Sequence, residues 1–170
     1  MIKLRPIPLS KAGFSSFGEV IETDGVEGSA INQGFAERFS DLARIDVAAE
    51  GGLVNVSIVT ANPRSVPVAI KLMERHPLGS QIFYPLQDRP WLVLVCADPR
   101  DGASFQAFTA TGRQGINYAR NIWHHPLLVF DDDSRFFVVD RKGPGNNMEE
   151  VGLEMGKELT LTFPARRLRP

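Results

Sequence analysis

The sequence predicts a single, mainly β domain, and three observations support this prediction. The chain has 170 residues, of which 43% are hydrophobic and 23% charged, as in one ordinary globular domain. Short apolar and β-branched runs recur along it, and turn-forming residues separate them. Helical signals are few. Many short strands at this spacing favour an antiparallel sandwich or barrel over residues 1–170.

The expected strands are the apolar runs themselves. Pairs such as Gly51-Gly52, Asn62-Pro63 and Thr111-Gly112 lie between them and tolerate tight or left-handed backbone conformations. The alternation of strands and helices that is typical of a parallel sheet is missing. In chain order, the runs are 53–60, 66–73, 82–84, 91–96, 104–110, 116–118, 127–130, 136–139 and 158–163.

A few short helical turns are expected near the N-terminus. Ser10 is a suitable N-cap for a helix that carries Phe14 and ends at Gly18. Residues 37–42 predict another turn or two. Residues 24–34 are rich in Gly, Ser and Asn and predict a surface loop.

The overall charge excludes several classes of partner. The formal net charge is -1 and the pI is near 6.3, so no nucleic-acid or membrane partner is indicated. The basic residues at 166–169 predict a solvated end. A secretory signal and a long apolar run are missing, so we expect a cytoplasmic protein. Cys96 is the only cysteine and lies in an apolar run, which predicts a buried, unreactive thiol.

The first candidate site motif ends the run from Val68 to His76. If this run is one strand, Val68, Glu74 and His76 share its apolar face. A carboxylate and an imidazole on such a face are costly unless they are paired, hydrated or bound to a metal. The alternative is that both side chains only reach the rim of the sheet.

The second motif comprises residues 119–126. In an extended chain, Arg120, Ile122 and His124 share one face, and Trp123 and His125 share the other. The adjacent histidines would then point in opposite directions. We therefore expect His124 to serve chemistry and His125 to be structural, although a buried His bonded to a backbone carbonyl is an alternative for either.

Together the motifs look like a modified cupin pattern, with Glu74, His76, Gln81 and His124 in its four metal-ligand positions. One carboxylate and two imidazoles are good ligands for a divalent transition metal, whereas a neutral amide oxygen is a weaker one. A loosely held metal ion such as Ni²⁺ and a metal-free proton-transfer site both remain open.

Several motifs, among them residues 14–21, 74–81, 115–118 and 123–126, occur together in this order. On these motifs the chain closely resembles the ureidoglycolate lyase family, formerly called ureidoglycolate hydrolases. Matching motifs occur in order over nearly the whole length, which makes the resemblance highly specific. The sequence departs from the family pattern at Ala119, where many relatives carry His, and at Asn121, where Gly is common. The matching segments are 14–21, 31–32, 38–41, 74–81, 115–118, 123–126 and 139–141.

This resemblance implies a carbon-nitrogen lyase that splits ureidoglycolate into glyoxylate and urea in allantoin degradation, a part of purine metabolism. It also implies a cupin-like antiparallel β-barrel or jelly roll, a homodimer, and no nucleotide cofactor. One alternative function is a ureidoglycolate amidohydrolase that releases ammonia. Another is a non-catalytic cupin that binds small carboxylates.

The reaction needs a base for the substrate hydroxyl, an acid for the leaving nitrogen and a cation for the carboxylate. We expect His124 or His76 to be the base and Glu74 to be its partner or the acid. Arg120 or Arg75 would bind the carboxylate, since guanidinium pairs bidentately with carboxylates. Further candidates for hydrogen bonds to the substrate are Asn32, Gln81, Asn117 and Tyr118.

Overall fold

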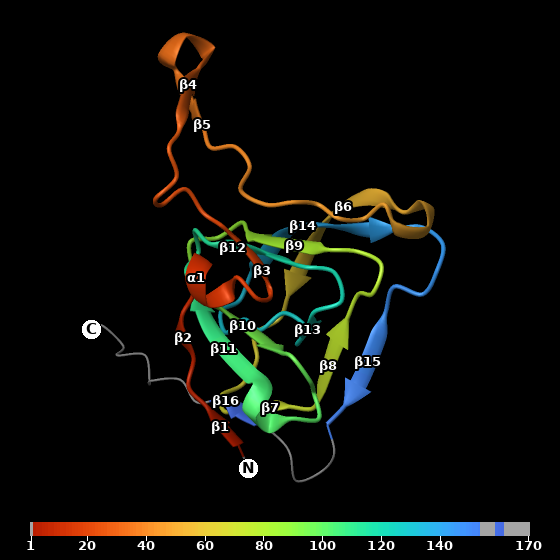
Figure 1. Cartoon of the computed structure of the whole chain (residues 1–170). Helices are drawn as coiled ribbons and strands as arrows, with labels where there is room; N and C mark the ends of the chain where they lie inside the picture. Colours follow the sequence, from red (N-terminus) through yellow and green to blue (C-terminus); the bar gives the residue numbers. More distant parts are fainter. Residues whose placement is uncertain (1, 154–158, 162–170) are drawn as a thin grey trace, which may run out of the picture.

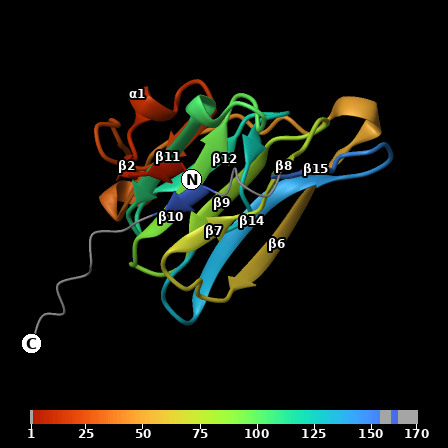
Figure 2. The ribbon, with the colours of Figure 1, turned by 90° about the horizontal axis from the view of Figure 1, so that it is seen from below.

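The computed structural model describes residues 2–153 and 159–161, and most of its elements are strands. Two large sheets pack face to face, and a small hairpin projects from one end of the body (Figure 1). A view from below shows the layered arrangement of the strands (Figure 2). The prediction of a mainly β fold is thereby confirmed. The described strands form separate sheets, so the architecture is a sandwich and not a closed barrel.

The first sheet has six strands, in the order β15-β8-β13-β10-β11-β2. Neighbouring strands are antiparallel except β11 and β2, which run parallel. The two-residue strand β13 lies between β8 and β10, and the site forms beside it. The strands are β2 (Ile7–Pro8), β8 (Leu72–Arg75), β10 (Trp91–Cys96), β11 (Phe105–Ala110), β13 (Trp123–His124) and β15 (Glu149–Gly152).

The second sheet has five antiparallel strands, in the order β3-β12-β9-β14-β6. Its longest members, β14 and β6, pair over nine residues each. Strand β6 is an edge strand, because β14 is its one neighbour among the described strands. The strands are β3 (Gly18–Ile21), β6 (Leu53–Ala61), β9 (Gln81–Pro85), β12 (Gly115–Tyr118) and β14 (Ser134–Lys142).

The main core lies between these two sheets. Val93 and Phe108 from the first sheet meet Ile116 and Phe136 from the second. Strand β10 is buried along its whole length, because both of its faces are covered. Its side chains Leu94 and Cys96 point away from the main core and pack in a second one. Cys96 is buried, as predicted, and this burial raises the pKa of its thiol to about 12.

The expected single strand over residues 66–73 is wrong. The chain forms β7 (Val68–Ile70) and β8, and Lys71 interrupts the ladder between them. Strand β7 joins a three-stranded sheet with β16 (Leu159–Leu161), which pairs parallel with β1 (Ile2–Leu4). Ile70 and Met73 both enter the second core, so the break shifts the alternation by one residue. Strand alternation had predicted that Glu74 and Val68 share a face, and this prediction is wrong.

A two-stranded hairpin replaces the expected loop and helical turn in this part of the chain. Strands β4 (Ser29–Ile31) and β5 (Ala36–Arg38) pair with each other around the short helix η1 (Asn32–Gly34). The turn needs a left-handed backbone at Asn32 and Gln33, with φ of 52° and 61°. Residues 37–42 contain the end of β5 and irregular backbone, so the helix expected there is wrong.

The N-terminal helix was predicted correctly at its start but not at its end. Helix α1 (Lys11–Phe14) begins after Ser10, whose hydroxyl accepts a hydrogen bond from the Gly13 amide at 3.1 Å. It ends before Gly18, which instead begins β3 and approaches Asn117 of β12 closely. The other short helices are η2 (Ala49–Gly51) and η3 (Gly102–Ser104).

Most of the other expected strands are present, with two differences. Residues 127–130 contribute one isolated bridge at Leu128 in place of a strand, and the short strands β1, β2, β3 and β15 were not expected. Among the described residues, no helix is long and apolar enough to cross a membrane. The basic segment 166–169 lies outside the described residues.

Candidate active site

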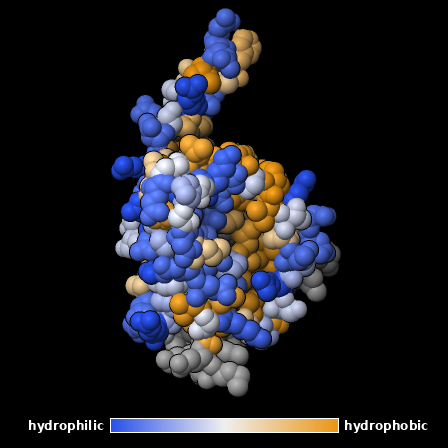
Figure 3. Space-filling model, turned by 90° about the vertical axis from the view of Figure 1, so that its right-hand side faces the viewer, coloured by the Kyte–Doolittle hydropathy of each residue, from blue (hydrophilic) through white to orange (hydrophobic). Residues whose placement is uncertain are grey.

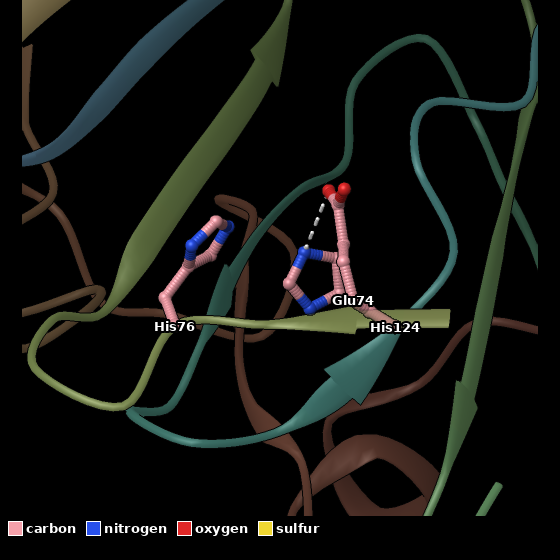
Figure 4. Close-up of side chains that lie close together, drawn as sticks. All are labelled: Glu74, His76 and His124. Atoms are coloured by element: carbon pink, nitrogen blue, oxygen red, sulfur yellow. Dashed lines mark ion pairs between the residues drawn. The ribbon is translucent and has the colours of Figure 1, made fainter. Parts of the chain in front are cut away.

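The site forms where β8 and β13 pair in the first sheet. Glu74 lies opposite His124 in the register of this pair, and His76 follows the end of β8. Figure 4 shows the Glu74 and His124 side chains together, with the His76 ring approaching from the neighbouring turn. One ligand atom from each of the three residues lies within 4.8 Å of the others. The structure therefore brings together the three residues that were expected to form the active site.

Glu74 and His124 are in direct contact. His124 Nε2 lies 3.5 Å from a carboxylate oxygen of Glu74, and the His124 side chain is almost completely buried. The His76 ring centroid lies 5.2 Å from that of His124. Because the site lies between packed sheets, its charges are only weakly screened by solvent.

Backbone carbonyls fix the orientation of both imidazoles. His76 Nδ1 donates to the Asn147 carbonyl at 2.8 Å, and His124 Nδ1 donates to the Ile122 carbonyl at 2.9 Å. A carbonyl oxygen only accepts, so in each neutral ring the Nε2 atom carries the lone pair. Neither Nε2 atom has a hydrogen-bond partner. Both rings therefore present an acceptor to the Glu74 carboxylate, an arrangement that is stable only when a proton or a metal cation lies between them.

Gln81 adds a third unpartnered atom. Its Oε1 is buried without a hydrogen-bond donor, and it lines a small cavity together with His76 and Asp140. Two imidazole nitrogens, a carboxylate and an amide oxygen fit a divalent transition metal. Among the described residues, Glu74, His76 and His124 are the group that could hold such an ion.

The cluster also changes the proton affinity of its members. Burial raises the pKa of the Glu74 carboxyl, but the close contact with His124 and the nearby imidazoles outweigh it and lower the pKa overall. Burial lowers the pKa of His76, and the Asn147 carbonyl offsets only part of this effect. At neutral pH, Glu74 is therefore an anion and His76 is a neutral base.

A cavity of about 550 Å³ opens at one side of the cluster. Glu74 and His124 contribute to its wall, and Phe83 and Trp91 supply apolar surface. His125 lines it as well, so the expectation that His125 faces away from the site is wrong. Strand β13 ends at His124, and strand alternation no longer applies beyond that residue.

Two predicted contacts on β12 occupy different positions relative to the cavity. Tyr118 lines it and stacks on the His124 ring, with centroids 4.1 Å apart and planes inclined by 16°. Asn117 is buried and donates from Nδ2 to Glu19 and to the Arg44 carbonyl, at 2.8 and 2.9 Å. Its other amide atom, Oδ1, has no partner.

The predicted cations and Asn32 do not line the cavity. Arg75 forms an ion pair with Glu149 and lies over the Trp123 ring, 4.5 Å from its centroid. Arg120 is exposed in a turn that Asn121 closes with a φ of 70°, so the strand expected to align it with His124 is not formed. Asn32 lies in η1 at the tip of the hairpin that projects from the body (Figure 1).

Sequence reasoning missed two residues at the site. Arg64 lines the cavity from the segment after β6, and the Asn147 carbonyl orients His76. Asn147 also accepts a hydrogen bond from the Leu78 amide through Oδ1, which fixes the turn after β8. A signal existed for Arg64, because it follows the Asn62-Pro63 turn at a strand end, where binding residues are common.

Comparisons with known proteins give a consistent result. The family model for ureidoglycolate lyase matches residues 1–160. Ureidoglycolate lyase 1 of Rhizobium meliloti is 53% identical over 144 residues, covering 84% of this chain and 85% of the relative. Ureidoglycolate lyase of Burkholderia mallei is 48% identical over 154 residues, covering 90% of this chain and 91% of the relative.

Similarity to solved structures is weaker. A structure of Bacillus subtilis oxalate decarboxylase, studied for its Mn(II) centres, aligns with a TM-score of 0.39 and 16% identity. The alignment covers 59% of this chain and 24% of that one. The family assignment depends instead on the sequence matches, which extend over nearly the whole chain and include the Glu74, His76 and His124 motifs. The chain belongs to the ureidoglycolate lyase family.

Proposed function

We propose that this chain cleaves ureidoglycolate to glyoxylate and urea at the Glu74–His124 pair. The observation that carries the proposal is that both side chains line the cavity of about 550 Å³ while His76 approaches them from the next turn. Such a volume suits a small substrate. The membership of the chain in the ureidoglycolate lyase family supports the same reaction.

The chemistry is an internal transfer of one proton. The reacting carbon of ureidoglycolate bears a hydroxyl group and the ureido nitrogen. Removing the hydroxyl proton lets the carbon-oxygen double bond of glyoxylate form as the carbon-nitrogen bond breaks. Protonation of that nitrogen releases urea, so a single group that takes the first proton can return it in the second step.

His124 is suited to this transfer. Its Nδ1 is held by the Ile122 carbonyl, which leaves the Nε2 lone pair beside Glu74 at the cavity. The Glu74 carboxylate stabilises the imidazolium that forms after proton uptake. The neutral imidazole of His76 lies beside His124, with ring centroids 5.2 Å apart, and lines the small cavity that contains Gln81.

We also propose that Glu74, His76, Gln81 and His124 hold a divalent transition metal ion such as Ni²⁺. Two orphaned imidazole nitrogens and the unpartnered Gln81 oxygen support this assignment. When bound, such an ion would polarise substrate oxygens and lower the pKa of the hydroxyl group. In that case His124 and Glu74 would both be ligands, and the proton would be taken by the Glu74 carboxylate oxygen that does not bind the ion.

The test is a product assay. Purified protein incubated with ureidoglycolate should release urea together with glyoxylate, and the His124→Ala variant should lose about a hundredfold in turnover. Ammonia as the primary product would instead identify an amidohydrolase. Tight binding without turnover would identify a binding protein.

We propose further that the enzyme is cytoplasmic and works as a homodimer. Strand β6 carries no charged residue, and its outward side chains Val54, Val56 and Ile58 are exposed on an edge strand. An exposed apolar edge of this kind readily pairs with another chain. Figure 3 shows a broad hydrophobic area on the body below the projecting hairpin.

A further inference from the structure

None of the cationic side chains predicted from the sequence to bind the substrate carboxylate lines the cavity at the active site. Glu74 places a carboxyl group in the wall of this cavity, so a substrate carboxylate needs a cation nearby. Among the described residues that line the cavity, Arg64 is the one Arg or Lys. It lies at the mouth of the cavity, where its side chain is exposed.

The other arginines near the active-site motifs are engaged elsewhere or lie outside the cavity. Arg75 is bound to Glu149 through Nε at 2.7 Å and stacks on Trp123. Arg141 is buried and donates to the Ala49 and Pro144 carbonyls. Arg120 is exposed in its turn and does not line the cavity.

The backbone holds Arg64 in place while its guanidinium group has no acidic partner among the described ion pairs. The Arg64 amide donates to the Val129 carbonyl at 2.8 Å, which ties the segment after β6 to the segment after β13. His125 is the residue that follows β13, and it lines the same cavity as Arg64.

We infer that Arg64 binds the carboxylate of the substrate at the mouth of the cavity. A guanidinium group pairs with a carboxylate through two parallel hydrogen bonds, which fixes orientation as well as position. With its carboxylate held there, a small 2-hydroxy acid would extend into the cavity toward Glu74 and His124. This inference rests on the proposed function, because it assigns the binding of the substrate of that reaction.

The first experiment measures binding without turnover. Oxamate carries a carboxylate, and oxamide is its neutral counterpart of similar size. The wild-type protein should bind oxamate about tenfold or more tightly than oxamide in calorimetry, the scale of a charge-assisted pair. Arg64→Gln should lose most of this preference, and Arg64→Lys should retain part of it. An unchanged preference in Arg64→Gln would overturn the inference.

The second experiment uses urea release from ureidoglycolate. Arg64→Gln should raise KM by about tenfold or more, with a smaller change in kcat. Arg113→Gln is the matched control, because Arg113 is an exposed surface residue paired with Asp88, and it should behave as the wild type. A large rise in KM for Arg120→Gln, with Arg64→Gln unchanged, would contradict the inference. If the wild-type protein releases no urea, the proposed function fails, and the oxamate result still stands by itself.

Discussion

The ring of Tyr118 lies flat against the ring of His124, with centroids 4.1 Å apart and an interplanar angle of 16°. Tyr118 comes from β12 of the second sheet and His124 from β13 of the first, so the stack joins the two layers at the site. Burial and the nearby Glu74 carboxylate raise the pKa of the Tyr118 hydroxyl, which stays protonated at neutral pH. Tyr118 thus offers a rigid neutral surface that orients the imidazole.

Replacing this ring should therefore slow the reaction. We expect Tyr118→Leu to lower kcat about threefold to tenfold, because an aromatic pair contributes about 0.5–1.5 kcal/mol beyond its area. Tyr118→Phe keeps the stack and should stay within about twofold of the wild type on the same argument. Steady-state urea release measures both. An equal loss in the two variants would show that the hydroxyl group, and not the stack, is important.

Metal content should follow the ligand set at the site. Untagged protein should contain a divalent transition metal by mass spectrometry, and a chelator should lower its Tm, because a bound ion stabilises the folded state. His76→Ala should lose the metal and the response to chelator. Gln81→Glu should hold the metal more tightly, because a carboxylate is a stronger ligand than an amide. A full complement of metal in His76→Ala would reject this ligand set.

His125 should make the fold less stable in mild acid. Burial lowers its pKa below the ordinary value of 6.5, so the unfolded chain takes up the proton first as the pH falls. The contribution of neutral His125 to the free energy of unfolding is complete above pH 6.5. It declines as the pH falls through that value toward the pKa of His125 in the folded protein. Urea unfolding at pH 7.5 and 5.5 should show this loss, and it should be smaller in His125→Asn. The same loss in both proteins would exclude His125 as a cause.

His76 contributes to acid sensitivity with the same sign, because its pKa is also lowered by burial. His125→Asn should therefore keep part of the effect. The lowered pKa of Glu74 acts at more acidic pH, since its stabilising effect is lost only as the pH falls through a value below 4.5.

The sequence was sufficient to predict most of the long strands and the three central site residues, for different physical reasons. Strand β10 is a continuous apolar run and β6 alternates clearly, so local pattern determines both. Glu74, His76 and His124 stood out because charged or titratable groups are costly in apolar surroundings. Their spatial convergence was expected from the resemblance, and the pairing of β8 with β13 produces it.

The failures occur where backbone breaks change the side-chain direction. The interruption at Lys71 and the turn at Asn121 each change which face the following side chains point to. Neither interrupts the pattern of apolar residues, so the sequence gives no sign of them. Arg64 was missed because it reaches the site from a loop after β6, far from both motifs in the chain. Contacts of this kind depend on how the sheets pack, which local pattern does not encode.

Arg141 should be important for stability without taking part in the chemistry. It donates to the Ala49 and Pro144 carbonyls, both at 2.7 Å, while its neighbour Asp140 accepts from Asn55. Arg141→Met would leave these carbonyls without a donor and should cost about 3 kcal/mol in urea unfolding. Arg113→Met, at an exposed ion pair, should cost less than about 1 kcal/mol. Similar losses in the two variants would contradict this role.

Charge on the exposed face of β6 should prevent the proposed dimer. Val56 and Ile58 are 58% and 56% exposed, and they lie opposite Val139 and Phe137 of β14. Ile58→Lys would bring two like charges together near a two-fold axis, which is unfavourable. Light scattering should then give the mass of a monomer, with an unchanged circular dichroism spectrum.

The matched control for this test is Leu86→Lys, because Leu86 is also an exposed apolar residue, at 51%, but lies beyond the end of β9. This variant should keep the mass of the wild-type protein. A dimer that survives both Ile58→Lys and Val56→Lys would place the interface on another face. A wild-type protein that is monomeric at micromolar concentration would reject the homodimer itself.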